Sequence, residues 1–143
     1  MKLTSTDFTT NKKLDKKFSY RESNISPHLK WEGAPNGTKS FAVSCNDPDA
    51  PVGDWIHWLI YNIPAEKDEI PQGGPIPGIE VKNDYGQIGY GGPAPPSGTH
   101  RYFFRVYALD IENLEGINKN NFMKKVKQHT IESAELIGLY SAK

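Results

Sequence analysis

The feature that most constrains the fold is a set of three apolar segments separated by clusters of proline and glycine. Residues 40–45 alternate in the manner of a β-strand, with Phe41, Val43 and Cys45 on one side. Residues 55–63 are almost continuously apolar, and residues 102–109 are rich in aromatic and β-branched side chains. Prolines follow the first two segments and cannot continue a β-ladder. This pattern predicts a mainly-β fold with antiparallel strands.

The rest of the chain predicts loops, one or two helices and little else. With 13 Gly and 11 Pro among 143 residues, turns should be frequent. Residues 64–100 are expected to be mostly loop, with a short strand near 79–81. Asn118 is expected to cap a helix that runs to about His129. Periodicity leaves open whether residues 134–140 form a last strand or extend this helix. Residues 1–143 are therefore expected to form a single domain, an antiparallel β-sheet or sandwich with one or two peripheral helices.

Composition excludes several classes of protein. The 17 Lys and Arg balance the 17 Asp and Glu, whereas nucleic-acid binders usually carry a basic excess. The polar residues 1–11 do not resemble a secretory signal, and segment 55–63 is too short to be a transmembrane segment. Cys45 is the one cysteine, so no internal disulfide can form and a cytoplasmic location is expected. Its place in an apolar strand indicates an inert core thiol.

Four polar residues are expected to meet at one end of the predicted sheet. His100 and Tyr102 are two residues apart and therefore share a face if the strand begins that early. His57 lies near the start of its strand, and Asp47 follows the end of another. In antiparallel neighbours the end of one strand lies beside the start of the next, which would bring the four together.

This set of side chains suits an oxyanion such as phosphate. A histidine ring and a tyrosine hydroxyl are donors, and phosphate oxygens are strong acceptors. Asp47 is expected to accept a proton from a histidine and so orient that ring. Glycines such as Gly91 and Gly92 would let backbone N–H groups approach the anion. The alternative that both histidines are hydrogen-bonded core residues stays open.

No pattern in the sequence indicates catalysis. No serine lies in a nucleophile elbow, and no compact set of metal ligands occurs. The chain is therefore expected to be a binding protein without a cofactor or metal, and not an enzyme; a hydrolase is the less favoured alternative.

Several segments in the same order resemble the phosphatidylethanolamine-binding protein family, also known as Raf kinase inhibitor-like proteins. They are Asp-Pro-Asp-Ala-Pro at 47–51, Trp-Ile-His-Trp at 55–58 and the Gly/Pro-rich stretch that leads to His-Arg-Tyr at 92–102. Residues 24–27 and 138–140 also match family positions. The compact length is similar to the bacterial and archaeal members.

The resemblance implies a β-sandwich with a small anion pocket near the surface. By motif match, the pocket would be lined by Asp47, His57, His100 and Tyr102, and its rim would be formed by Pro51, Trp55, Gly92 and Pro95. The Ala50–Pro51 bond matches a position that is cis in the family. Implied ligands are phospholipid head groups, nucleotides or phosphorylated small molecules. An alternative role is regulation of a protein partner, such as a kinase or protease, through the pocket rim; homodimer formation is left open.

Four residues or segments near these motifs carry further expectations. Ile56 stands where many members carry His or Trp, which would remove a rim contact. The short stretch between Pro96 and His100 would alter the pocket mouth. Arg101 is expected to point away from the pocket into a salt bridge, and His28 is expected to be an exposed loop histidine.

Overall fold

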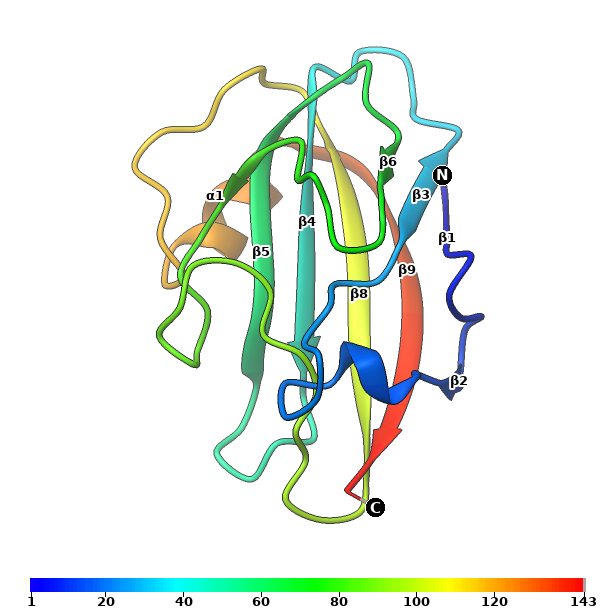
Figure 1. Ribbon diagram of the computed structural model, residues 1–143. Helices are drawn as coiled ribbons and strands as arrows, with labels where there is room; N and C mark the ends of the chain where they lie inside the picture. The colour runs from blue at the N-terminus through cyan, green and yellow to red at the C-terminus, as the bar shows by residue number, and fades with distance from the viewer. Residues whose placement is uncertain (143) are drawn as a thin grey trace.

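The computed structural model describes residues 1–142 and contains two β-sheets packed face to face (Figure 1). The small sheet contains, in spatial order, β1 (Lys2–Thr4), β3 (Leu29–Glu32) and β6 (Glu69–Ile70). The large sheet contains, in spatial order, β2 (Lys12–Lys13), β9 (Thr130–Ser141), β8 (Thr99–Leu109), β4 (Ser40–Asp47), β5 (Trp55–Pro64) and β7 (Ile79–Glu80). All neighbours are antiparallel except β2 and β9. The predicted mainly-β, antiparallel sandwich is therefore confirmed.

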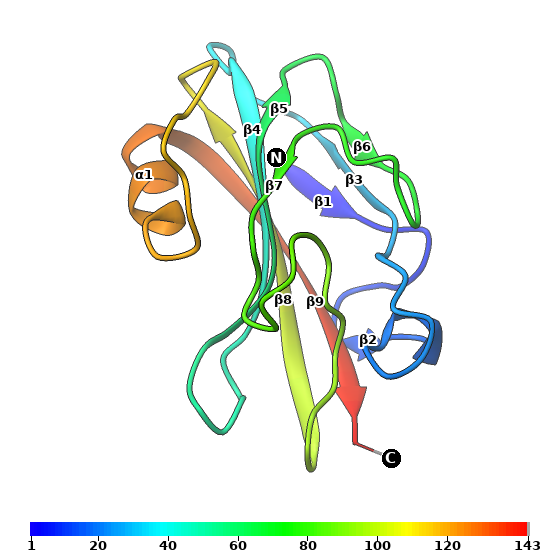
Figure 2. The ribbon, with the colours of Figure 1, turned by 60° about the vertical axis from the view of Figure 1, so that its left-hand side comes forward.

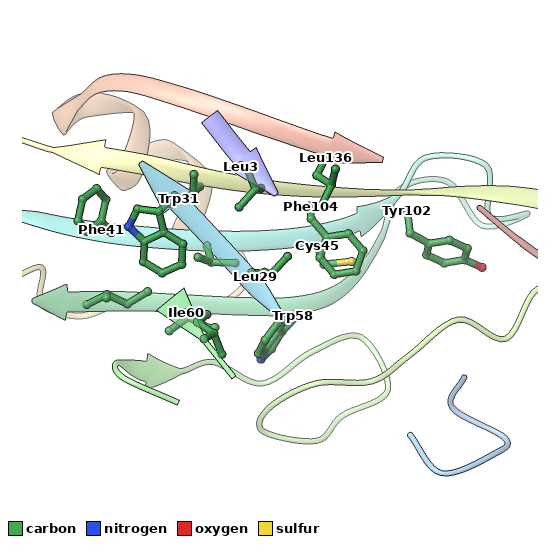
Figure 3. Packing of buried hydrophobic residues seen from close by; sticks show 14 of the residues in the cluster. Leu3, Leu29, Trp31, Phe41, Cys45, Trp58, Ile60, Tyr102, Phe104 and Leu136 are labelled. Carbon is green, nitrogen blue, oxygen red and sulfur yellow. The ribbon is translucent and has the colours of Figure 1, made fainter. Parts of the chain in front are cut away.

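Strand alternation builds the core between the two sheets. Phe41, Val43 and Cys45 of β4 point to the same side and are buried, as their spacing predicts. They meet Trp31 and Leu29 of the small sheet (Figure 3). The Cys45 thiol is fully enclosed, and burial raises its pKa, so the thiol is unreactive as predicted.

The outer face of the large sheet is partly covered by α1 (Phe122–His129) (Figure 2). Phe122 and Val126 are one turn apart and pack in a second buried cluster with Leu59 and Tyr107 of the sheet. The helix ends where predicted but begins four residues later than Asn118. The Asn118 side chain instead accepts the backbone N–H groups of residues 120 and 121, which forms a turn before the helix.

The structure also decides the state of residues 134–140 and of the Ala50–Pro51 bond. The open choice for residues 134–140 is resolved as strand, because they lie within β9, which pairs along its whole length with β8. Among residues 1–142 the one cis peptide bond is Gly74–Pro75, so the expected cis bond at Ala50–Pro51 is wrong. No helix in this part of the chain is long and apolar enough to cross a membrane.

A β-bulge in β5 decides which way His57 points. Cys45 of β4 pairs with Trp58, but the next residue, Asn46, pairs with Ile56, so His57 is an extra residue in β5. Trp58 packs in the core between the sheets, and Ile56 packs in the cluster on the opposite face. Simple alternation would turn His57 away from that core. The bulge places its ring on the inner side, beside Tyr102.

Candidate functional site

A cavity of about 200 Å³ lies at the end of the large sheet where β4 ends and β5 and β8 begin. Two loops cover it, one joining β4 to β5 and the other leading into β8; both lie at the bottom of Figure 1. It is lined by Asp47, Ala50, Pro51, Val52, Trp55, His57, Tyr85, Ala94, Pro95, Pro96, His100 and Tyr102. The four residues predicted to converge do converge, and the rim residues Pro51, Trp55 and Pro95 lie with them.

Asp47 holds the ring of His100. The Nδ1 atom of His100 lies 2.7 Å from one carboxylate oxygen of Asp47, and both side chains are buried. The other carboxylate oxygen accepts the backbone N–H of Asp49 at 2.8 Å. Both oxygens of Asp47 are thus engaged within the protein, and the Nε2 atom of His100 is left for a ligand. The Asp47 carboxylate therefore fixes the orientation of the His100 ring.

His57 is held in a different way. Its Nδ1 atom lies 2.6 Å from the carbonyl oxygen of Gly91, so Nδ1 carries the proton and donates it. Burial lowers the pKa of His57 below its ordinary value of 6.5, although the Gly91 carbonyl and the Asp47 charge partly oppose this effect. The ring is therefore neutral at pH 7, and Nε2 carries a lone pair.

Tyr102 supplies a hydroxyl group that has no hydrogen-bond partner among the described residues. The residue is 1% exposed, and its ring packs edge-on against His57 at a centroid distance of 5.1 Å. The hydroxyl points away from the core cluster (Figure 3). Burial and the nearby Asp47 charge raise the pKa of Tyr102, so the hydroxyl stays protonated. Buried polar groups are nearly always paired, so this donor is suited to an acceptor from outside the chain.

Tyr85 is a wall residue that the sequence did not reveal. Its ring packs edge-on against Trp55 and His57 and stacks on Tyr20 at 3.8 Å. Its hydroxyl donates to the carbonyl of Gly92 at 2.8 Å, and burial raises its pKa to about 12. The available signal was an aromatic residue between Asp84 and Gly86 in a long loop, which does not distinguish a wall residue from a surface residue.

The expected roles of Gly91 and Gly92 are wrong. The N–H of Gly91 donates to the carbonyl of His57, and the N–H of Gly92 donates to the Asn24 side chain. Neither group is free for an anion, and Gly92 does not line the cavity. A Cβ atom on Gly92 would lie 1.9 Å from the carbonyl oxygen of Phe18. Glycine is required there because two backbone segments approach closely.

The expectation for Arg101 is confirmed. Its guanidinium makes two hydrogen bonds of 2.9 and 2.8 Å with the carboxylate of Asp49, outside the cavity. This partner lowers the pKa of Asp49 to about 2. The contact holds the β4–β5 loop against the start of β8. Arg101 therefore helps to position a loop that covers the cavity, without lining the cavity itself.

The expectations for His28 and Ile56 are wrong. His28 is 7% exposed, because its two ring nitrogens are used inside the protein, one by the Thr6 backbone N–H and the other by Glu69. Ile56 is not at the cavity mouth, because the bulge turns it to the opposite face of the sheet. No group of three or more His, Cys, Asp or Glu side chains within residues 1–142 is arranged to hold a metal ion.

A family model described as phosphatidylethanolamine-binding protein matches residues 4–141. Two similar relatives bear the name UPF0098 protein. One from Methanothermobacter thermautotrophicus is 43% identical over 148 residues, covering 98% of each chain. The other, YbhB of Escherichia coli, is 42% identical over 158 residues, covering 99% of this chain and 100% of the relative.

Two solved structures share the fold over almost their whole length. YbcL of Escherichia coli, described as a new member of the mammalian PEBP family, superposes with a TM-score of 0.94 at 33% identity, covering 99% of this chain and 98% of the other. CT736 of Chlamydia trachomatis, described as a putative phosphatidylethanolamine-binding protein homolog, gives a TM-score of 0.91 at 36% identity, covering 99% and 97%.

Proposed function

Because the chain belongs to the phosphatidylethanolamine-binding protein family, we propose that it binds small phosphate-bearing ligands in the cavity beneath the two loops. Phospholipid head groups, nucleotides and phosphorylated small molecules share the phosphate group that the cavity would recognise. The observation that supports this proposal most directly is the Tyr102 hydroxyl, which is buried without a partner beside His57. A phosphate oxygen would supply the hydrogen-bond acceptor that this hydroxyl lacks within the protein.

The proposed anion lies between Tyr102 and the two histidine rings. Tyr102 donates its hydroxyl proton, and His100 donates from Nε2 while Asp47 orients the ring through Nδ1. Each oxygen of Asp47 already accepts one hydrogen bond within the protein, from His100 and from the Asp49 backbone N–H.

Because His57 is neutral at pH 7, the proposed binding of an anion requires a proton between Nε2 and the phosphate. The neutral ring carries a lone pair on Nε2, which would repel a phosphate oxygen without a proton. Either the phosphate keeps one proton or the ring takes one up when the anion binds. The charged ring and the more protonated form of the phosphate both become more abundant at lower pH, so the affinity is expected to rise as the pH falls.

The test is a crystal soaked with phosphoethanolamine, combined with calorimetric titration of phosphate. We expect density for the phosphate group between His57, His100 and Tyr102. His100→Gln should weaken phosphate binding at least about tenfold, because a charge-assisted hydrogen bond is lost. His129→Gln is the matched control, since that histidine pairs with Asp110 outside the cavity. Equal effects of the two substitutions would overturn the proposal.

A binding role without catalysis is part of the same proposal. The cavity holds a carboxylate and two histidines but no serine or cysteine among its lining residues. We expect no turnover of generic phosphoesters or carboxylic esters. Turnover that disappears in His57→Ala would show that the chain is a hydrolase.

The rim supports a second candidate function, regulation of a protein partner such as a kinase or protease. Val52 is 77% exposed at the cavity mouth, where it lies beside exposed Pro51. Exposed apolar groups beside a polar hollow suit a protein contact. Capture of a partner that survives saturating phosphate and is lost in Val52→Asp would support this function. Capture that phosphate abolishes would favour the small-ligand function.

A further inference from the structure

A second hollow, of about 470 Å³, is lined by α1 and by the face of the large sheet opposite the anion cavity. Figure 2 shows α1 on this side of the large sheet, away from the small sheet. We propose that the hollow binds a monocarboxylate that carries an apolar body. The observations that support this are a pair of buried hydroxyls on its floor, a single lysine without an acidic partner at its edge, and an apolar wall formed by the sheet and the helix.

The floor holds Ser44 and Tyr107, whose hydroxyl oxygens are 2.9 Å apart. Both residues are at least 95% buried, being 3% and 5% exposed. The pair has two hydroxyl protons, and their mutual hydrogen bond uses one. The Tyr107 hydroxyl also lies 3.7 Å from the sulfur of Met123, which is a weak acceptor, and near the Arg105 guanidinium, which can only donate. One buried O–H group therefore lacks a strong acceptor, and a carboxylate oxygen would supply one.

One of the three cations at the edge of the hollow has no ionic partner within residues 1–142. Arg105 pairs with Glu135 at 2.8 Å, and Lys119 pairs with Asp84 at 2.8 Å. Lys127 of α1 also lines the hollow and forms no hydrogen bond or ion pair within residues 1–142. The one acidic residue in the lining, Asp54, accepts a hydrogen bond from Asn46 at 2.6 Å. A carboxylate bound near Lys127 would give this ammonium group an ionic partner.

The wall of the hollow suits the apolar body of such a ligand. It is formed by Ile56 and Leu59 of β5 and by Phe122 and Met123 of α1. Methionine adapts its shape to a bound apolar group more readily than a branched side chain does. Each methylene buried there is expected to strengthen binding about fourfold.

The test is an NMR titration of the 15N-labelled chain with octanoate, acetate and octanol. We expect octanoate to shift the amide signals of Ser44, Tyr107 and Met123. Acetate and octanol should shift them less, because acetate lacks the apolar body and octanol lacks the charge. Saturating phosphate should leave octanoate binding unchanged, because the two cavities are on opposite faces of the sheet. Competition by phosphate, or equal binding of octanol and octanoate, would overturn the proposal.

Matched variants separate the hollow from the surface of the helix. Lys127→Gln and Tyr107→Phe should each weaken octanoate binding at least about fivefold, because each removes one charge or donor. Lys124→Gln, which changes an exposed lysine outside the hollow, should have no effect. Circular dichroism of each variant checks that it is folded. If Lys127→Gln and Lys124→Gln bind octanoate alike, the inference is wrong.

Discussion

At the scale of single residues, the cavity contains two histidines that are prepared for different tasks. The Nδ1 atom of His100 faces the Asp47 carboxylate, whereas that of His57 faces the carbonyl oxygen of Gly91. Burial keeps His57 neutral at pH 7. Tyr102 has neither kind of partner, so its hydroxyl is the donor left most clearly for a ligand. The two histidines therefore differ because their Nδ1 atoms contact different groups, the Asp47 carboxylate for His100 and the Gly91 carbonyl for His57.

The Tyr102 hydroxyl is expected to contribute to binding and not to stability. Tyr102→Phe should weaken phosphate binding about tenfold or more, because a hydrogen bond to a charged acceptor is lost. Its free energy of unfolding without phosphate should equal or exceed that of the wild type, because a buried hydroxyl without a partner is removed. Calorimetric titration and urea denaturation measure the two quantities. A large loss of stability would mean that the hydroxyl has a partner within the protein.

His57 is expected to make stability depend on pH. Its pKa is lower in the folded chain than in the unfolded chain, where it is about 6.5. As the pH falls below that value, the unfolded chain gains a proton that the folded chain resists, so the free energy of unfolding decreases.

Bound phosphate should restore part of this stability, because it favours the charged ring. Urea denaturation between pH 7.5 and about pH 5, with and without phosphate, measures both effects. His57→Gln should lose both, and His129→Gln should retain both. Retention of the full pH dependence in His57→Gln would assign it to another group.

At the scale of elements, the bulge in β5 places His57 in the cavity. It inserts one residue between the pairs Cys45–Trp58 and Asn46–Ile56, so that His57 and Trp58 share the inner side. The residues of β4 and β8 follow strict alternation, which is why His100 and Tyr102 were placed correctly from their spacing and Asp47 from its position at the end of its strand. A bulge changes the face of every residue beyond it, so Ile56 lies on the face opposite the rim position that the resemblance implied.

A substitution at Ile56 tests the bulge directly. Ile56→His should leave phosphate affinity within about twofold of the wild type, because the side chain lies on the face opposite the cavity. It should also destabilise the chain, since a polar ring replaces an apolar side chain that packs beneath the helix layer. Val52→His, at the cavity mouth, is the comparison expected to change affinity. A gain of affinity in Ile56→His would contradict the bulged register.

At the scale of the whole molecule, segments far apart in the sequence hold the cavity together. The loop before β8 packs on the N-terminal part of the chain, where the Gly92 N–H donates to Asn24 and the Tyr90 hydroxyl donates to the carbonyl of Phe18. The Arg101–Asp49 pair ties the other loop to β8. Both loops are thus fixed from outside the cavity, which leaves its donors free.

Gly92→Ala tests this arrangement. The new Cβ atom would meet the Phe18 carbonyl oxygen at 1.9 Å, which forces two backbone segments apart. We expect the free energy of unfolding to fall by at least about 3 kcal/mol and phosphate affinity to fall with it. Ser97→Ala, in an exposed part of the same loop, is the control. Urea denaturation at constant pH measures the change, and a loss below about 1 kcal/mol would show that the contact yields easily.

The sequence by itself determined three of the long strands, the sandwich class and the meeting of Asp47, His100 and Tyr102 at one end of the sheet, whereas the place of His57 there depends on the bulge. Alternation and the positions of prolines are local signals, and the order of the motifs along the chain indicates the family. Both can be recognised without knowledge of contacts between distant segments. Tertiary structure decided the features that depend on contacts between distant segments. The bulge depends on pairing between β4 and β5, the burial of His28 depends on Thr6 and Glu69, and Gly92 is set by the backbone of Phe18. Each of these outcomes rests on a contact between distant segments, and a sequence read along its length does not contain that contact.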